Sequence, residues 1–277
     1  MTKPIISVIL GSYNRLPFLK LTIESVRKEL INIEYETIII DGGSNDGTLN
    51  WLQNQRDIIT IIQYNRGTWN SKKIITKSWG YFMNLGFKCA HGKYICMLSD
   101  DCLIVPNAIT NSIQLFEKKL EEKEKIGAIA FYWRDWPVDN KYHIGIPLEN
   151  KIYVNHGLYL KRALEEVNYI DEETFVFYAA DIDLCLKMSQ KNYNVIASEN
   201  SYIEHYPHAN LKVRKLNAKN DLPDLKKLKI KWEKIFPEIN YYDLATIKEK
   251  DYDDPFLTAQ KFQQLHLQIQ KNNVLFF

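Results

Sequence analysis

Short apolar runs alternate with amphipathic segments over the first 105 residues, and no other feature of the chain constrains the fold as much. The apolar runs have the length and the Ile-rich composition of buried strands, at 5–10, 37–40, 58–64 and 94–98. Helical patterns lie between them, at 17–30, 48–54 and 77–90. Nearly continuous apolar strands separated by helices predict a mostly parallel α/β sheet with helices on both faces.

Polar clusters follow these strands at the point where each strand ends. Tyr13 lies just beyond the first run, Asp41 directly follows the second, and the pair Asp100 and Asp101 follows the fourth. In open parallel sheets, ligands bind outside the carboxyl ends of the strands. The sequence therefore predicts one site at that edge of the sheet.

The second half of the chain has a different pattern. A charged helix, a strand and two short strands are expected, at 107–125, 126–133, 195–197 and 201–204. From about residue 211, Lys-rich helical segments are broken by prolines. We therefore expect one domain at 1–210, with halves at 1–105 and 106–210, and a helical C-terminal extension at 211–277.

Composition excludes several classes of protein. With 277 residues, 45% of them hydrophobic, the chain can bury a sizeable core. A net charge of +2 is too balanced to suggest nucleic acid as a partner. The four cysteines form no C-x-x-C pair and no zinc spacing. Because the apolar runs are too short for a signal peptide or a membrane span, a reduced cytoplasmic protein is expected.

Asp100 and Asp101 are adjacent carboxylates at the end of an apolar strand, so they repel each other unless a cation or a donor compensates. Mg²⁺ or Mn²⁺ bound together with a diphosphate would do so, since hard cations take one or two carboxylates and phosphate oxygens. The alternative is an acidic pair that caps the next turn.

Other candidates also have two interpretations. Asp41 precedes two glycines. Its carboxylate could accept hydrogen bonds from a ligand or from the backbone of its own turn. Asp181 and Asp183 lie at an expected loop-to-helix junction. An acid at this position can act as a general base, or it can simply stabilise the positive end of the helix dipole. His205 ends a short strand, either as a metal ligand or as a structural residue.

Taken together, the motifs resemble those of the family 2 glycosyltransferases. SVILGSYNR at 7–15 resembles the opening S-V-I-I-P-T-Y-N-R of that family, and ETIIIDGGSNDGT at 36–48 is similar to its E-I-I-V-V-D-D-G-S-T-D-G-T. The stretch from 90 to 101 resembles A-x-G-x-Y-I-x-x-L-D-D-D, which carries the metal-binding D-x-D. FYAADIDLCL at 177–186 resembles F-x-Y-x-E-D-x-D-L-x-L. Gly42, Ser99 and Ala180 depart from acidic positions of these motifs, which leaves Asp101 as the main expected metal carboxylate.

The resemblance implies a GT-A fold and an inverting transfer of sugar from a nucleotide-diphosphate sugar, most simply a UDP-sugar, to an acceptor hydroxyl. Residues 1–105 would bind the nucleotide and 106–210 the acceptor. The implied cofactor is Mn²⁺ or Mg²⁺, held by Asp101 and His205, and the implied catalytic base is Asp181. The implied nucleotide-binding residues are Tyr13, Arg15, Asp41, Arg66 and Asp100.

The acceptor is expected to be a growing glycan or a lipid-linked glycan. Its candidate binding residues are Trp133, Trp136, His156 and Asp183, with a core role as the alternative for Trp133. The Lys-rich stretch at 225–235 fits either a peripheral contact with the inner face of an anionic membrane or a solvated helical face.

Two other functions remain open. A nucleotidyltransferase also uses acidic metal ligands, but it would usually show a Gly-rich basic loop after the first strand, where this chain has Ser12 to Arg15. The second alternative is a glycan-binding relative that has lost catalytic activity, because Ser99 and Ala180 stand where the family motifs have acids. Release of free sugar from a donor would separate an active transferase from such a module.

Overall fold

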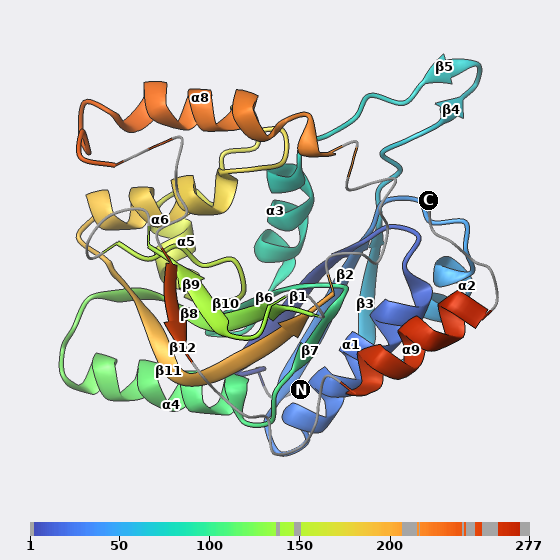
Figure 1. The fold of residues 1–277 in the computed structure, drawn as a ribbon, viewed down its shortest axis with the longest axis horizontal. Coiled ribbons are helices and arrows are strands. Elements are labelled where there is room, and N and C mark those ends of the chain that lie inside the picture. Colours follow the sequence, from blue (N-terminus) through green and yellow to red (C-terminus); the bar gives the residue numbers. More distant parts are fainter. Residues whose placement is uncertain are drawn as a thin grey trace.

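The apolar runs assemble into one large mixed sheet, shown in Figure 1. The computed structural model describes residues 3–136, 139–146, 151–206, 215, 217–239, 241, 247–250 and 260–271. Within these residues the strand order is β12-β9-β8-β10-β6-β1-β2-β3, with β11 beside β8 and β7 beside β11. The strands of this sheet are β1 (Ile6–Ser12), β2 (Tyr35–Asp41), β3 (Ile58–Ile62), β6 (Tyr94–Ser99), β7 (Cys102–Ile104), β8 (Ile126–Asp135), β9 (Tyr142–Gly145), β10 (Gly157–Leu160), β11 (Asn194–His205) and β12 (Ile247–Lys250).

Helices cover the sheet, and a short hairpin extends from it. The helices are α1 (Leu16–Glu29), α2 (Thr48–Gln53), α3 (Trp79–Cys89), α4 (Ala108–Glu121), α5 (Lys161–Glu166), α6 (Ala180–Gln190), α8 (Asp221–Trp232) and α9 (Gln260–Lys271). The hairpin is β4 (Thr68–Trp69) with β5 (Lys72–Lys73). In the part of the chain that the structure describes, no helix is long and apolar enough to cross a membrane.

The first half confirms the predicted α/β architecture. β3, β2, β1 and β6 are parallel neighbours, and β1 is almost entirely buried. The second half adds antiparallel neighbours, because β10 pairs with both β6 and β8 in that sense. The two short strands expected at 195–197 and 201–204 are one strand, β11, whose register against β8 shifts between Ala197 and Tyr202.

Close packing of α3 on the sheet depends on Gly86. A Cβ atom at this position would lie 2.5 Å from Ile9 Cγ2 and 2.8 Å from Ile40 Cδ1. The missing side chain therefore lets α3 approach β1 and β2, while Phe82, Met83 and Phe87 of the same helix enter the core.

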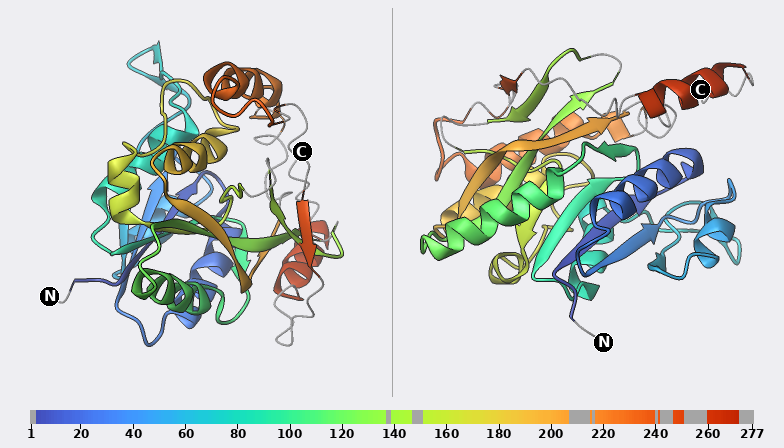
Figure 2. Two further views of the ribbon diagram at one scale, coloured as in Figure 1. Left: turned by 90° about the vertical axis from the view of Figure 1, so that its left-hand side faces the viewer. Right: turned by 90° about the horizontal axis from the view of Figure 1, so that it is seen from below.

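The C-terminal extension packs on the rest of the chain, but it is not purely helical. Leu228 and Trp232 of α8 belong to the main hydrophobic core, and Phe262 of α9 packs with Phe18 and Tyr206. The two views of Figure 2 and the order of the sheet show β12 as an additional edge strand beside β9. The expectation of a helical extension was therefore incomplete, because an edge strand is set by a neighbour distant in sequence.

Candidate functional site

The polar strand ends meet at one edge of the sheet, as their positions in the sequence predict. Ser12 of β1 is in register with Asp41 of β2, and Gly11 is in register with Ser99 of β6. His205, the last residue of β11, is in register with both Asp135 of β8 and Cys102 of β7. Parallel and antiparallel pairing together therefore bring Asp100, Asp101 and His205 to the same place.

Asp100 and Asp101 form the buried centre of this site. Each is about 2% exposed, and Arg15 Nη1 lies 2.8 Å from Asp100 Oδ1 and 2.8 Å from Asp101 Oδ2. Burial and the neighbouring carboxylate raise the pKa of Asp100, although Arg15 opposes the shift. Burial would also raise the pKa of Asp101, but Arg15 and His205 outweigh it and hold that pKa below its usual range. One guanidinium thus compensates two carboxylates.

His205 joins Asp101 to a third acid. Its Nε2 lies 3.4 Å from Asp101 Oδ1, and its Nδ1 lies 2.7 Å from Asp135 Oδ1. Burial lowers the pKa of His205, but the two carboxylates outweigh it and raise the pKa to about 9. Asp135 is absent from the sequence-based candidates, although it carries the same signal as Asp41, an acid that ends an apolar strand.

A divalent ion fits the residues around Asp101. Among the described residues, Asp101 Oδ1 has no hydrogen-bond partner although it is buried, and His205 Nε2 is its neighbour. A carboxylate with an imidazole suits Mn²⁺, and a carboxylate with phosphate oxygens suits Mg²⁺. Asp101 and His205 are therefore the residues that would hold the ion.

Tyr13 and Arg66 form a flat surface at the ends of β1 and β3. The Arg66 guanidinium carbon lies 5.0 Å from the centroid of the Tyr13 ring. Gly42 lies beneath this ring, because a Cβ at Gly42 would be 3.3 Å from Tyr13 Cδ2. The replacement of the usual Asp by glycine at this position thus leaves room for the tyrosine. An aromatic ring with a guanidinium over it offers a stacking surface for a nucleobase.

Asp41 hydrogen-bonds within its own turn, and its predicted role toward a nucleotide stays a prediction. It is fully buried, and Oδ1 accepts hydrogen bonds from the backbone N–H groups of Gly43 (2.8 Å) and Ser44 (2.7 Å). Its Oδ2 accepts from the Ser44 hydroxyl at 2.7 Å. The carboxylate therefore shapes its own turn, which was the alternative that the sequence left open. Ser44 Oγ in turn accepts from the N–H of Asn14, so Asp41 supports the loop that carries Tyr13.

Asp181 lies on the first turn of α6, after the left-handed Ala179 (φ 63°). Its side chain is half-buried, and burial raises its pKa to about 6. Asp181 and Asp135 both raise the pKa of Tyr153, after the larger effect of burial. Asp181 and Asp135 are therefore both near enough to Tyr153 to act on its hydroxyl.

Three predicted acceptor residues are buried and have partners in the core. Asp183 is fully buried and accepts from Trp232 Nε1 at 2.7 Å, with Lys231 Nζ 2.8 Å away. Trp133 is 6% exposed and lies edge-on to His143, with ring centroids 4.4 Å apart. His156 is 1% exposed and lies 3.2 Å from Ser99 Oγ and from Cys102 Sγ. These contacts give all three side chains partners inside the protein, and their role toward an acceptor stays a prediction.

Trp136 was the fourth predicted acceptor residue. Its ring stacks on Tyr206, with centroids 5.7 Å apart, and lies 6.3 Å from Phe262 of α9. These contacts place Trp136 in the small aromatic cluster that joins α9 to α1. The structure therefore gives it packing partners in the C-terminal extension, which the local sequence around Trp136 could not show.

Comparison with known proteins identifies the relatives of this chain. The domain family described as Glycosyl transferase family 2 matches residues 7–122. Protein CgeD of Bacillus subtilis (strain 168) is 28% identical over 116 residues, which are 42% of this chain and 27% of CgeD. The uncharacterized glycosyltransferase YfnE of the same organism is 28% identical over 132 residues, 46% of this chain and 30% of YfnE. The chain thus matches less than a third of the length of these two relatives.

Solved structures share the fold over most of the chain. Staphylococcus aureus TarS superposes with a TM-score of 0.58 at 15% identity, over 87% of this chain and 45% of TarS. The mannosyltransferase PcManGT of Pyrobaculum calidifontis, solved with GDP-Man and Mn²⁺, superposes with a TM-score of 0.56 at 14% identity, over 82% of this chain and 65% of that protein. The predicted fold class, a GT-A type mixed α/β sheet, is confirmed.

Proposed function

We propose that this chain, which carries a glycosyl transferase family 2 domain at residues 7–122, transfers a sugar from a nucleotide-diphosphate sugar to a hydroxyl of a glycan or lipid-linked acceptor. One observation carries the proposal: the buried pair Asp100 and Asp101 lies at the carboxyl end of β6, bonded to Arg15 and beside His205. The pair lies where α/β sheets bind ligands. Residues 1–105 then bind the donor, 106–210 face the acceptor, and the extension at 211–277 supports both.

The nucleotide base stacks on Tyr13 and Arg66 in this proposal, with Asp41 and Ser44 holding the loop in place. The donor is a UDP-sugar. The complexes of TarS residues 1–349 with UDP and with UDP-GlcNAc, which cover 84% and 87% of this chain, support that choice. A GDP-sugar is the competing donor, because PcManGT was solved with GDP-Man.

The donor diphosphate lies against the acid pair, where Asp101 and His205 would hold Mn²⁺ or Mg²⁺. A bound ion would stabilise the negative charge that develops on the leaving diphosphate. Asp100 faces the ribose or sugar hydroxyls. Arg15, which holds both carboxylates in the structure, turns toward the phosphates when an ion replaces it.

Asp181 acts as the general base. Its pKa of about 6 leaves it mostly deprotonated at neutral pH and makes it a stronger base than an ordinary carboxylate. It takes the proton of the acceptor hydroxyl as the oxygen attacks the anomeric carbon from the face opposite the diphosphate. A single displacement of this kind inverts the anomeric configuration.

The test is sugar transfer or donor hydrolysis by wild type, Asp181→Asn and Glu173→Gln. Asp181→Asn keeps the shape and removes the base, so turnover should fall by about 10²–10⁴-fold while the donor still binds. Glu173→Gln is the matched control, because this acid is exposed on the loop before α6. Near wild-type turnover by Asp181→Asn would remove it as the base. Absence of any sugar release by wild type would favour the decayed glycan-binding relative.

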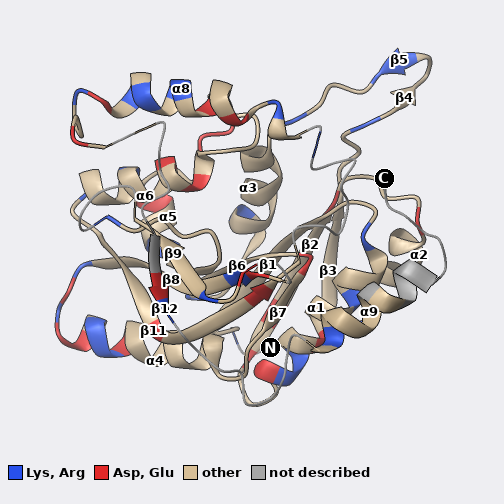
Figure 3. Cartoon of the chain, viewed as in Figure 1, with Lys and Arg blue, Asp and Glu red and all other residues tan. Residues whose placement is uncertain are grey.

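We also propose a cytoplasmic location with a peripheral membrane contact at α8. Lys residues recur along this helix (Figure 3), and Leu222 and Ile230 are exposed on it. Exposed apolar side chains beside lysines favour binding to an anionic surface. Co-sedimentation with anionic vesicles, compared with Ile230→Ser, tests this contact, and equal sedimentation of the two proteins would contradict it.

A further inference from the structure

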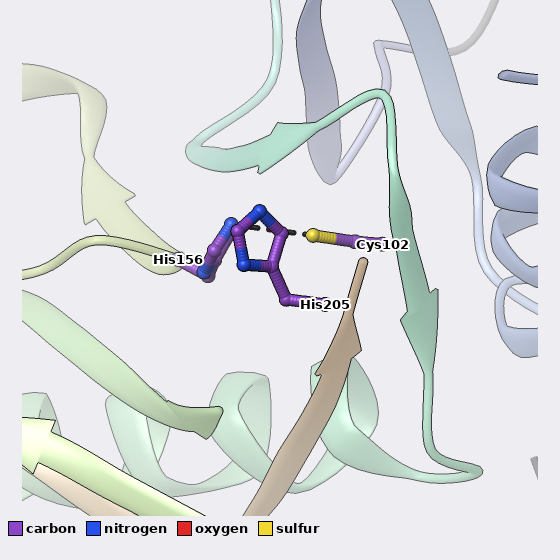
Figure 4. A group of neighbouring side chains, drawn as sticks. All are labelled: Cys102, His156 and His205. Carbon is purple, nitrogen blue, oxygen red and sulfur yellow. Dashed lines mark hydrogen bonds between the residues drawn. The ribbon is translucent and has the colours of Figure 1, made fainter. Parts of the chain in front are cut away.

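Cys102, His156 and His205 converge from three separate elements, as Figure 4 shows. Cys102 begins β7, His156 directly precedes β10, and His205 ends β11. One ligand atom from each side chain lies within 4.8 Å of the others, and Cys102 Sγ is 3.2 Å from a ring nitrogen of His156. Local spacing could not reveal this group, since Cys102 and His156 alone are 54 residues apart.

The group is buried. Cys102 is fully buried and His156 is 1% exposed. The His156 nitrogen that faces Cys102 is Nε2, which lies 3.2 Å from both Cys102 Sγ and Ser99 Oγ. A thiol and two imidazoles in contact are the ligands that bind soft and borderline divalent ions, above all Zn²⁺.

The backbone around the group is held in place. His205 and Cys102 are direct partners in the antiparallel pair of β11 and β7. The carbonyl of His156 accepts a hydrogen bond from the N–H of Phe131 in β8. Zn–N and Zn–S bonds of about 2.0–2.1 and 2.3 Å place tetrahedral ligand atoms roughly 3.3–3.6 Å apart. Because the three ligand atoms lie within 4.8 Å of one another, side-chain rotations that move them by about 1 Å suffice to bind the ion.

We propose that Cys102, His156 and His205 form a Zn²⁺ site. Three protein ligands leave the fourth position open, as in zinc sites that take an exchangeable ligand. This site is distinct from the hard-ion site at Asp101, although the two share His205. It needs the Cys102 thiolate, which a Mn²⁺ or Mg²⁺ site does not.

Sharing His205 has a consequence that rests on the proposed function. Zn²⁺ bound to His205 removes the imidazole from the ion at Asp101, whose Oδ1 lies 3.4 Å from His205 Nε2. Zn²⁺ and Mn²⁺ therefore compete, and Zn²⁺ lowers the Mn²⁺-dependent affinity for UDP. The Zn²⁺ site itself does not depend on the donor or on transferase activity.

The experiment is titration of the full chain with Co²⁺, a spectroscopic substitute for Zn²⁺, followed by displacement with Zn²⁺. Wild type should show intense thiolate-to-metal charge transfer and the visible bands of tetrahedral Co²⁺, at one ion per chain. Cys102→Ser should lose the charge-transfer band, and His156→Gln should bind at least tenfold more weakly. Cys89→Ser is the matched control, because Cys89 is exposed and outside the group. It should retain the full spectrum.

Two results would overturn the Zn²⁺ site. One is a weak spectrum of octahedral Co²⁺ in wild type, and the other is a charge-transfer band that survives Cys102→Ser. His156→Gln keeps the assignment testable if Cys102→Ser does not fold. Calorimetry of UDP with Mn²⁺ separates the proposals: if Cys102→Ser binds UDP as wild type does but no variant binds Co²⁺ through sulfur, only the Zn²⁺ site fails. If Co²⁺ binds through sulfur and no nucleotide binds, only the proposed function fails.

Discussion

Asp224→Ala should loosen the loop that leads to Asp181, although Asp224 lies 43 residues further along the chain. Asp224, in the first turn of α8, is fully buried. Its carboxylate accepts from the backbone N–H groups of Val176 (3.1 Å to each oxygen), Phe177 (2.9 Å) and Tyr178 (3.0 Å). Alanine would leave these three donors without their acceptor.

The expected loss in the free energy of unfolding follows from the number of donors that lose their acceptor. A hydrogen bond to a charged group contributes about 1.5–3 kcal/mol, but the three bonds share one carboxylate and do not add fully. Removing one partner of a buried charged interaction costs about 3–5 kcal/mol, so we expect a loss of about that size. Asp224→Asn keeps one acceptor oxygen and should lose about 1–2 kcal/mol.

Urea denaturation and hydrogen exchange at 176–178 measure the effect. Asp221→Ala is the matched control, since Asp221 begins the same helix but is exposed. Under the proposed function, Asp224→Ala should also lower turnover more than donor affinity, because Tyr13 and Asp101 are untouched. If the free energy of unfolding of Asp224→Ala stays within about 0.5 kcal/mol of wild type and the exchange at 176–178 is unchanged, the Asp224 carboxylate does not hold this loop.

Further predictions concern the site and the core. The rate of transfer should fall as pH drops below about 6, because protonation of Asp181 removes the base; a rate profile without this limb in wild type would exclude the pKa assignment. Arg15→Gln should destabilise the ion-free protein by about 3–5 kcal/mol, because it removes the cation that Asp100 and Asp101 share and leaves His205 beside Asp101 alone. Mn²⁺ should then raise the melting temperature more than in wild type, and equal Mn²⁺ shifts would contradict the shared role of Arg15. Tyr13→Ala should weaken the binding of UDP, measured by calorimetry, by about 1–3 kcal/mol, because the base loses its stacking partner. Unchanged affinity would place the base elsewhere. Gly86→Val should cost at least about 1–3 kcal/mol in urea denaturation, since its Cβ overlaps Ile9, and a smaller loss would mean that α3 can shift.

Strand ends were predictable because two local signals coincide there. An apolar run marks a buried strand, and a polar cluster directly after it marks the point where the chain leaves the sheet. Asp100 and Asp101 follow this rule, and the structure places both at the sheet edge with His205. Asp135 follows it too, but the expected end of its strand at residue 133 hid the acid two residues beyond.

Contacts between distant segments were not predictable from the same signals. Whether Asp41 faces a ligand or its own turn depends on the loop conformation that Ser44 completes. Whether Asp183 is available depends on α8, whose Trp232 and Lys231 bind it from the extension. Both acids sit in motifs of the family, so the motif alone could not tell a ligand-binding carboxylate from a structural one.

The sequence by itself determined the parallel α/β half, the edge where the site forms and the residues Tyr13, Arg66, Asp101 and Asp181 as candidates, because strand length, turn residues and motif order are local properties. Tertiary structure alone decided the partners: Arg15 between two carboxylates, Asp135 behind His205, Asp224 under the loop before α6, and Cys102 beside two histidines. The physical reason is that burial and charge pairing set the chemistry of these side chains, and both arise only when strands and helices far apart in the chain pack together.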